Sequence, residues 1–170
     1  MNVVLRESDR LNGIITDFLA FARPAANGMD SSRENEIDVS LALRDCMALI
    51  KHSPDGCDAH EFECHLPDEP VKIRANESEI KQVFWNLAQN AIQAMPDGGK
   101  LAAELKRISP RRVRVTFTDT GTGIPDEILE HIFEPFTSGS GGTGLGLSIV
   151  YNIVRAHNGK ITVQSKKNKG

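Results

Sequence analysis

The sequence has few cysteines and no pair of them in a CxxC spacing. It contains Cys46, Cys57 and Cys64, an odd number that does not suit a framework of paired disulfides. Disulfide-stabilised secreted domains are therefore a poor match, and a reducing compartment is the better expectation.

An excess of charge of either sign is also missing, as is any long apolar run. The 20 basic and 23 acidic residues give a formal net charge of -3, which provides no reason to expect binding to nucleic acid or to an anionic membrane. No apolar run approaches the roughly 20 residues of a membrane-spanning helix, and there is no signal peptide. We expect a soluble, cytoplasmic chain of one domain with a short appendage.

The apolar periodicity predicts a helix, a linker and then a mixed domain. Val4, Leu11, Ile15 and Phe18 form a bundle-like seam on a helix over residues 2–23. The polar residues 24–35 are expected to be a linker, and residues 36–170 the domain.

Within that domain, strands and helices do not alternate as βαβ units. Strands are expected at residues 36–39, 61–66, 71–75, 101–108, 113–118 and 160–165. Helices are expected at 40–51, 76–95, 125–133 and 145–157, with Ser40 and Asn76 as N-caps. The order favours an α+β fold, an α/β sandwich in which a mixed, mostly antiparallel sheet is covered on one face by helices.

The stretch CDAHEFECH contains residue types that ligate zinc: Cys57, His60, Cys64 and His65. From His60 onward, however, the residues alternate with period two, so that Phe62, Cys64 and Leu66 share one face. The alternation favours a strand in which Cys64 is a small core residue rather than a metal ligand.

Two asparagines stand one turn apart on the expected helix over residues 76–95. Asn86 and Asn90 adjoin its apolar stripe, which consists of Ile80, Phe84, Leu87, Ala91 and Met95. They can form a polar edge that faces water. Alternatively, an amide oxygen can ligate a hard cation such as Mg²⁺, which often takes one or two protein ligands and completes its shell with water and phosphate.

Two glycine-rich stretches follow. Asp119 ends the expected strand VRVTFTD, and Gly121 and Gly123 come directly after it. A carboxylate there can accept a hydrogen bond from the exocyclic amine of a base, although an ordinary Asp-Thr-Gly turn explains the same residues. The stretch GGTGLGLSIV places glycines before a helix N-terminus, where free N–H groups favour phosphate.

In this order, NLAQNA, DTGTG, FEPF and GTGLGL resemble the catalytic and ATP-binding domain of bacterial sensor histidine kinases. That domain belongs to the superfamily shared with gyrase B subunits, mismatch-repair ATPases and heat-shock chaperone ATPases. The resemblance covers about residues 36–170, and residues 1–23 look like the second helix of the kinase dimerisation hairpin. It implies a Bergerat-type ATP-binding fold, the cofactors ATP and Mg²⁺, and transfer of the γ-phosphoryl group to a histidine and then to a response-regulator aspartate.

The resemblance also implies roles for individual residues. Asn90 would ligate Mg²⁺ and Asn86 would support the phosphate side, both as catalytic residues. Asp119 would accept from the adenine amino group, with Gly121 and Gly123 lining the base. The other expected nucleotide-site residues lie in the lid and at the start of the last helix: Phe133, Phe136, Gly142, Thr143, Gly144, Leu145 and Gly146.

The sequence departs from the family in several places. None of its five histidines lies in the phosphoacceptor context, the lid segment TSGSGG has no Lys or Arg, and the sequence stops before the usual closing strand. We therefore expect no autophosphorylation by this chain alone. The implied partners are a histidine-bearing dimerisation domain, within a homodimeric parent, and a response-regulator receiver domain; the signal and the membrane topology of the parent stay open.

Two alternatives of other classes remain. Gyrase- and chaperone-type ATPases carry a glutamate as the base for water where this sequence has Asn86, and an amide cannot take that proton. A nucleotide-binding or docking module without kinase activity is the other alternative, since the short lid supplies no cation.

Overall fold

The computed structural model describes residues 35–53, 59–110, 112–137 and 143–166. The elements in chain order are β1 (Asn35–Asp38), α2 (Val39–Lys51), β2 (His60–His65), β3 (Lys72–Ala75), α3 (Glu77–Gln93), β4 (Gly99–Ser109), β5 (Arg112–Asp119), α4 (Asp126–Leu129) and α5 (Gly146–Ala156). The predicted helix over residues 2–23 lies outside the described residues, and so does the linker except for Asn35, which is the first residue of β1.

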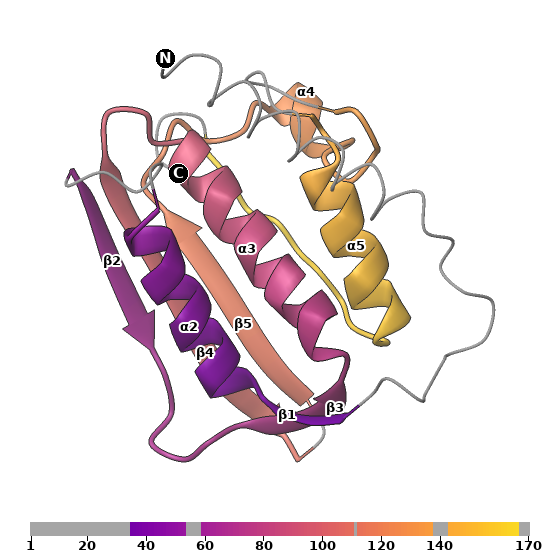
Figure 1. Ribbon diagram of the computed structural model, residues 1–170. Coiled ribbons are helices and arrows are strands. Elements are labelled where there is room, and N and C mark those ends of the chain that lie inside the picture. Colours follow the sequence, from indigo (N-terminus) through magenta and orange to yellow (C-terminus); the bar gives the residue numbers. More distant parts are fainter. Residues whose placement is uncertain (1–34, 54–58, 111, 138–142, 167–170) are drawn as a thin grey trace, which may run out of the picture.

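The strands form two sheets, and the long helices cover one face of them (Figure 1). In the larger sheet, of order β2-β4-β5, β2 pairs parallel with β4, and β4 pairs antiparallel with β5. The smaller sheet pairs β1 antiparallel with β3. Helices α2, α3 and α5 lie side by side in front of β4 and β5 (Figure 1). This arrangement confirms the predicted α+β sandwich with a mixed sheet.

The core lies between β4 and the helices. Leu101, Ala103 and Leu105 alternate along β4 and are at most 2% exposed, as the period of a half-buried strand requires. From the helices, Leu43 and Phe84 belong to the same buried cluster. Burial of each large apolar side chain contributes about 1.5–3 kcal/mol, so these contacts hold α2 and α3 on the sheet.

The helix caps confirm one prediction and correct another. Asn76 caps α3 through its Oδ1, which accepts from the Ser78 N–H at 3.1 Å. The predicted cap at Ser40 was wrong, because Asp38 is the N-cap of α2 and its Oδ1 accepts from the Ser40 N–H at 2.9 Å. Ser40 is instead buried, and its Oγ accepts from the Val71 N–H at 3.1 Å, which ties α2 to the segment before β3.

Cys64 and the last predicted strand are further corrections. Cys64 is exposed, although Phe62 and Leu66 on the same face pack against the core. Strand β2 is at the edge of the larger sheet, with a neighbouring strand on one side only. Residues 160–165 pair with no described strand, so the predicted strand there was wrong. Ile161 nevertheless packs against the core, as its apolar side chain requires.

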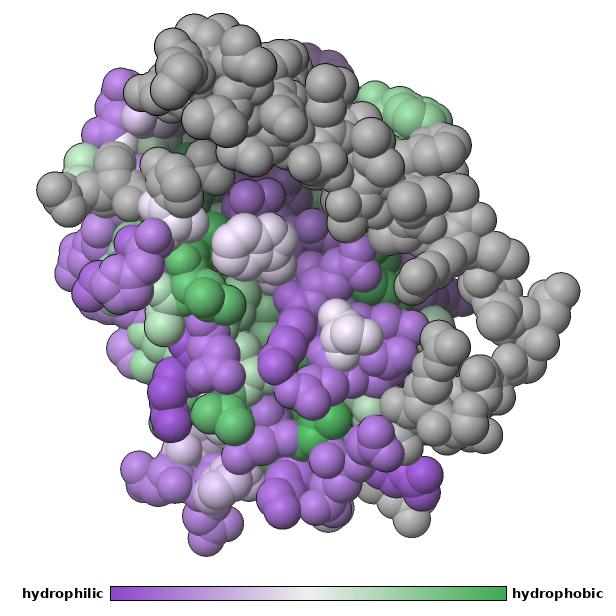
Figure 2. Space-filling view, viewed as in Figure 1, coloured by the Kyte–Doolittle hydropathy of each residue, from purple (hydrophilic) through white to green (hydrophobic). Residues whose placement is uncertain are grey.

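Helix α4 ends at Leu129, so the helix predicted over 125–133 is shorter than expected. The face that carries α2, α3 and α5 is mostly hydrophilic, with small separate hydrophobic patches (Figure 2). Among the described helices, none is long and apolar enough to cross a membrane.

Candidate functional site

Asn86 and Asn90 of α3 lie against the first residue of α5. Asn86 is 8% exposed, and its Nδ2 donates to the Gly146 carbonyl oxygen at 3.4 Å. A Cβ added to Gly146 would lie 3.8 Å from Asn90 Nδ2 and 3.9 Å from Asn86 Cγ. Two motifs far apart in the sequence therefore meet at a helix N-terminus, where backbone N–H groups lack intrahelical partners. Of the two alternatives for Asn86, a polar edge that faces water is not what the structure shows.

The Asn90 side chain has capacity for a ligand. Its Nδ2 is buried and has no hydrogen-bond partner within the described part of the chain. Such a group costs about 1–3 kcal/mol when it is left unsatisfied. The oxygen and nitrogen of an amide exchange places by a side-chain flip, so this position can present either a donor for phosphate or an oxygen for a hard cation. The residue chemistry thus fits Mg²⁺ together with phosphate.

Asp119 ends β5 in a turn that orients its carboxylate. Its Oδ1 accepts from the Gly121 N–H at 2.9 Å, which is an Asx-turn. The Asp-Thr-Gly turn that explains these residues locally is therefore present. Its second oxygen, Oδ2, accepts no hydrogen bond from the residues that the structure describes, so a fixed carboxylate keeps one oxygen for a ligand donor.

The Asp119 turn packs against the end of α3. A Cβ on Gly121 would lie 2.7 Å from the Ala94 oxygen, and the Thr122 N–H donates to that oxygen at 3.0 Å. Gly121 is thus required by backbone packing, whatever it contributes to a ligand. Because the Ala94 N–H donates to the Asn90 carbonyl at 3.0 Å, the turn lies one helical turn from Asn90. Gly123 adopts a left-handed conformation, with φ of 70°.

Phe136 and Gly144 close the base of the lid segment. The Phe136 N–H donates to the Gly144 carbonyl at 2.9 Å, and the two residues have φ of 66° and 68°. A Cβ on Gly144 would lie 2.5 Å from the Phe136 carbonyl carbon, so only glycine fits there. Gly142, predicted to be a site residue, lies outside the described residues, which resume at Thr143.

The remaining predicted residues lie at the start of α5 and beside it. Thr143 Oγ1 accepts from the Leu145 N–H at 3.3 Å, and Leu145 is 2% exposed. The ring of Phe133 packs against Tyr151 of α5 with 5.4 Å between ring centroids. Phe136 is 67% exposed and therefore projects from the lid base rather than packing in the core.

One titratable group near the lid is perturbed. His131 Nδ1 lies 2.8 Å from Glu134 Oε1, and this hydrogen bond raises the pKa of His131 above its ordinary value. Both side chains are exposed, at 57% and 65%. The pair thus forms part of the polar surface before the lid.

Two serines were missed by the sequence analysis. Ser165 Oγ accepts from the Ile124 N–H at 2.8 Å, and so supports the turn after Gly123. Ser148 is 2% exposed and donates from Oγ to the Leu145 carbonyl at 2.8 Å, within the first turn of α5. Ser148 could have been found as a serine in the first turn of a helix. No local pattern pairs Ser165 with a residue so far away in the sequence.

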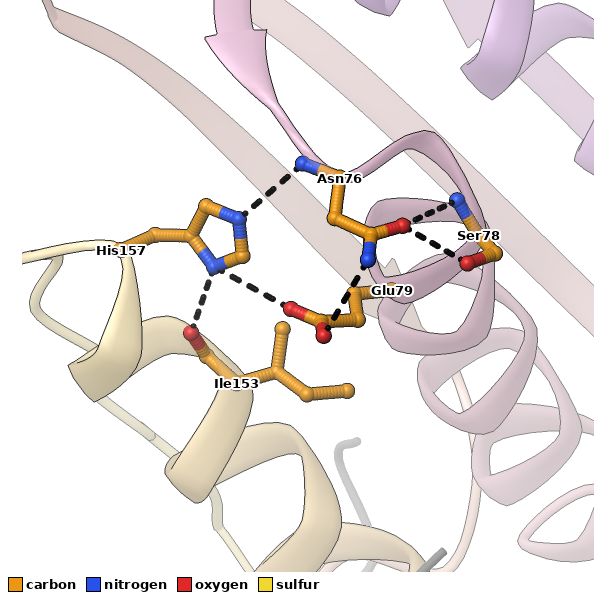
Figure 3. A network of polar contacts seen from close by, with 5 residues as sticks. All are labelled: Asn76, Ser78, Glu79, Ile153 and His157. Carbon is orange, nitrogen blue, oxygen red and sulfur yellow. Dashed lines mark hydrogen bonds and ion pairs between the residues drawn. The ribbon is translucent and has the colours of Figure 1, made fainter. Parts of the chain in front are cut away.

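A polar network fixes the far end of α5 on the start of α3 (Figure 3). His157, at the C-cap of α5, has its Nε2 3.4 Å from the Asn76 backbone nitrogen and its Nδ1 2.9 Å from the Ile153 carbonyl oxygen. Nδ1 also lies 3.8 Å from Glu79 Oε2. An Nδ1–H that donates to Ile153 and an Nε2 that accepts from Asn76 satisfy this geometry. The network therefore helps to set how α5 lies along α3, and hence where Gly146 meets the asparagines.

The histidine kinase-, DNA gyrase B- and HSP90-like ATPase family matches residues 75–170. That range includes α3 with its asparagines, the Asp119 turn, the lid base and α5. The chain belongs to this family. Membership of an ATPase family supports ATP binding by this domain.

The relatives by sequence are kinases. Sporulation kinase E of Bacillus subtilis (strain 168) is 34% identical over 170 residues, which are 99% of this chain and 22% of that protein. Sensor histidine kinase ZraS of Salmonella typhimurium is 36% identical over 173 residues, covering 99% of this chain and 35% of that protein. The chain thus spans about a third or less of the length of these two relatives.

Solved structures agree with the sequence relatives. Full-length ShkA in complex with AMPPNP is 30% identical with a TM-score of 0.77, over 96% of this chain and 36% of that chain. Histidine kinase ThkA in complex with response regulator protein TrrA is 28% identical with a TM-score of 0.68, over 93% of this chain and 44% of that chain. The predicted fold and the predicted kinase family are therefore confirmed.

Proposed function

We propose that this chain is the phosphoryl-donor half of a sensor histidine kinase. In the intact enzyme it binds ATP and presents the γ-phosphoryl group to a histidine, from which the group passes to an aspartate of a response regulator. The observation that carries the proposal is the buried Asn90 Nδ2 beside the N-terminus of α5, which has no hydrogen-bond partner among the described residues.

The adenine side of the site centres on Asp119. Its Oδ2 accepts a hydrogen bond from the exocyclic amine of the base, while Oδ1 is held by the Gly121 N–H at 2.9 Å. Gly123, in its left-handed conformation, gives a backbone surface without a side chain for the base. Ser165 holds the following backbone through Ile124, so it acts as a positioning residue.

The phosphate side centres on the start of α5. The Asn86 amide lies against Gly146, the first residue of α5, and the backbone N–H groups and dipole of a helix N-terminus favour negative charge. Gly146 leaves this region uncovered because it has no side chain. Phe133, Phe136, Thr143 and Gly144 anchor the two ends of the lid next to it.

Asn90 is the residue that would hold Mg²⁺. When bound, Mg²⁺ neutralises charge on the phosphates of the nucleotide. The protein groups do the rest by orientation, since phosphoryl transfer needs mainly positioning of the donor in line with its acceptor. Asn86 cannot accept a proton from water, which favours transfer to an external nucleophile over hydrolysis.

The wider assignments rest on the relatives. We infer that residues 1–23 are the second helix of a dimerisation hairpin and residues 24–34 a linker, in a homodimeric parent. The domain acts in the cytoplasm, where ATP and response regulators are present. The response-regulator partner is supported by the ThkA and TrrA complex, which concerns a protein of similar structure.

The test is phosphoryl transfer from γ-labelled ATP in the presence of a separate dimerisation fragment that bears the acceptor histidine. We expect acid-labile, alkali-stable label on that fragment and none on this chain. Asn90→Ala should lower the transfer rate by at least about tenfold, the loss of 1.4 kcal/mol. The matched control is Gln93→Ala, an exposed position on the same helix, which should leave the rate unchanged.

Each other outcome has a definite meaning. Label on a histidine of this chain alone would contradict the proposed division of roles. Intact ATP binding by calorimetry without any transfer to the fragment would favour a binding module instead. If Asp119→Asn bound ADP as tightly as the parent chain, the adenine assignment would be wrong.

A further inference from the structure

The turn of the β4–β5 hairpin carries a concentration of positive charge. Residues 106–114, KRISPRRVR, contain no acidic residue. We define the basic tip as five of these residues, which belong to β4 and β5: Lys106, Arg107, Ile108, Arg112 and Arg114. All five are exposed. Because the whole chain has a net charge of -3, this positive charge is local.

The pairing of the strands makes this charge unfavourable for the fold itself. Lys106 on β4 lies directly opposite Arg114 on β5. Like charges in directly opposed positions destabilise a strand pair. This pair of residues therefore does not stabilise the fold, and an anionic ligand that neutralised the two positive charges would relieve their repulsion.

Carboxylates do little to neutralise the basic tip. Lys106 Nζ lies 2.6 Å from Glu104 Oε1, but Arg107, Arg112 and Arg114 form no ion pair with any residue in the described ranges. Some lysines elsewhere in the described chain are paired with glutamates: Lys72 with Glu36, Lys81 with Glu77 and Lys100 with Glu63. The three arginines are thus available to an anion.

An apolar side chain stands among these charges. Ile108 is 51% exposed and lies between Arg107 and Ser109, where the register of β4 and β5 shifts. The bulge ends the alternation that buries Leu101, Ala103 and Leu105 further along the strand. A large aliphatic side chain is thereby presented at the end of a hairpin, surrounded by basic residues.

The basic tip is remote from the nucleotide site. The turn between β4 and β5 lies at the bottom of the view in Figure 1, whereas α4 and the start of α5 lie at the top. A partner at the tip would therefore leave the Asn90 region accessible.

We propose that the basic tip docks on anionic phospholipid headgroups, with Ile108 entering the interface. A nucleic acid would use the arginines but has no use for an exposed isoleucine. A stable protein interface needs roughly 800 Å² from each partner with a well-packed apolar centre, which a hairpin end with one large apolar side chain does not offer. A fluid lipid surface requires no complementary shape, and it accepts both the charges and the aliphatic group.

The expected affinity is weak and reversible. Each Lys or Arg near an anionic surface contributes about fivefold to partitioning, the equivalent of about 1 kcal/mol. The tip would therefore orient the domain at a surface to which something else holds it, rather than anchor the domain by itself.

The test is co-sedimentation of the 170-residue chain with vesicles of phosphatidylcholine, with and without phosphatidylglycerol. We expect binding only to the anionic vesicles, and its loss at high salt because the charges are screened. Arg112→Glu with Arg114→Glu should reduce partitioning by at least about 25-fold, as two contributions of fivefold. Ile108→Ser should reduce it by a smaller factor.

Matched controls lie on α2. Arg44→Glu with Lys51→Glu makes the same change in charge at exposed positions of another element, and Leu49→Ser removes an exposed leucine. Both should bind vesicles almost as the parent chain does. Equal loss in the α2 and tip variants would overturn the proposal, since net charge alone would then explain binding. Binding to single-stranded RNA but not to vesicles, with the same sensitivity to Arg112 and Arg114, would also overturn it.

Discussion

At the scale of single residues, glycines that look alike in the sequence are required for different reasons. Gly121 lies against the Ala94 oxygen, where a Cβ would be 2.7 Å away, so it serves the packing of a turn on α3. Gly144 combines φ of 68° with a Cβ position 2.5 Å from backbone of Phe136. Gly146 is neither strained nor crowded, since its Cβ would meet the asparagines at ordinary contact distances. Only the last of these glycines depends on a ligand for its explanation.

This difference gives a prediction for two alanine substitutions. Gly146→Ala should keep the folding stability within about 0.5 kcal/mol of the parent but weaken ATP binding about tenfold or more, because a methyl group would cover the Asn86 and Asn90 amides. Gly144→Ala should lower the free energy of unfolding by at least about 1–2 kcal/mol, because an L-residue is forced into a left-handed conformation. Urea unfolding and calorimetry with ATP measure the two quantities. Equal ATP affinity in Gly146→Ala and the parent would contradict the phosphate assignment.

The residue types of the site could be predicted from the sequence, but their surroundings could not. The spacing of Asn86 and Asn90 places them on one helix face in any structure that keeps the helix. That Asn86 is buried and donates to Gly146 depends on how α5 packs, which no local pattern encodes. For Cys64, the alternation predicted a core position on the face that it shares with Phe62 and Leu66. Cys64 is nevertheless exposed, and the sequence does not show that its strand is at the edge of the sheet.

At the scale of elements, α3 and α5 form the frame of the site. Helix α3 carries both asparagines, and the Asp119 turn packs against its C-cap residue, Ala94. Helix α5 brings Gly146 to the asparagines at its start and His157 to the Asn76 cap at its end (Figure 3). The two helices are thus tied at both ends, which fixes the spacing between the proposed phosphate and base sides of the site.

The His157 tie can be tested by truncation. His157→Ala should lower the free energy of unfolding by about 1–2 kcal/mol, because it leaves the partly buried Asn76 N–H without its acceptor. His52→Ala is a matched control, since His52 is the C-cap of α2 but is exposed and should change stability by less than about 0.5 kcal/mol. Urea denaturation of both variants provides the comparison. If the two substitutions had the same effect, the contact of His157 with Asn76 would not hold the helices together.

The signals that mark helices and strands in a sequence differ in range, and those of a helix are local. For α3, the start is marked by the cap residue Asn76 and the body by the apolar stripe. For α5, the end is marked by the glycine after Asn158. A strand requires a neighbour in register, and residues 160–165 have the right alternation without a described partner. For the same reason, the sequence could not show that β2 and β4 would pair in parallel.

At the scale of the whole molecule, two opposite ends of the folded domain differ in the residues that they expose. The end with α4 and the start of α5 brings together the groups suited to a nucleotide, and the opposite end carries the basic tip (Figure 1). Net charge conceals this division, because a total of -3 averages over a basic hairpin and an acidic remainder. The positions of the charges therefore carry information about possible partners that the net charge does not.

We propose that ATP binds between the Asp119 turn and the start of α5, with its terminal phosphate at Asn90 and Gly146. The most direct measurement is an NMR titration of the isotope-labelled chain with ADP and with AMPPNP, both in the presence of Mg²⁺. We expect the signals of Gly121 and Gly123 to shift similarly with both nucleotides. The signals of Gly146 and of the Asn90 side-chain amide should differ between them, since the two nucleotides differ at the γ position. Shifts concentrated elsewhere, or identical responses of Asn90 and Gly146 to both nucleotides, would contradict the account.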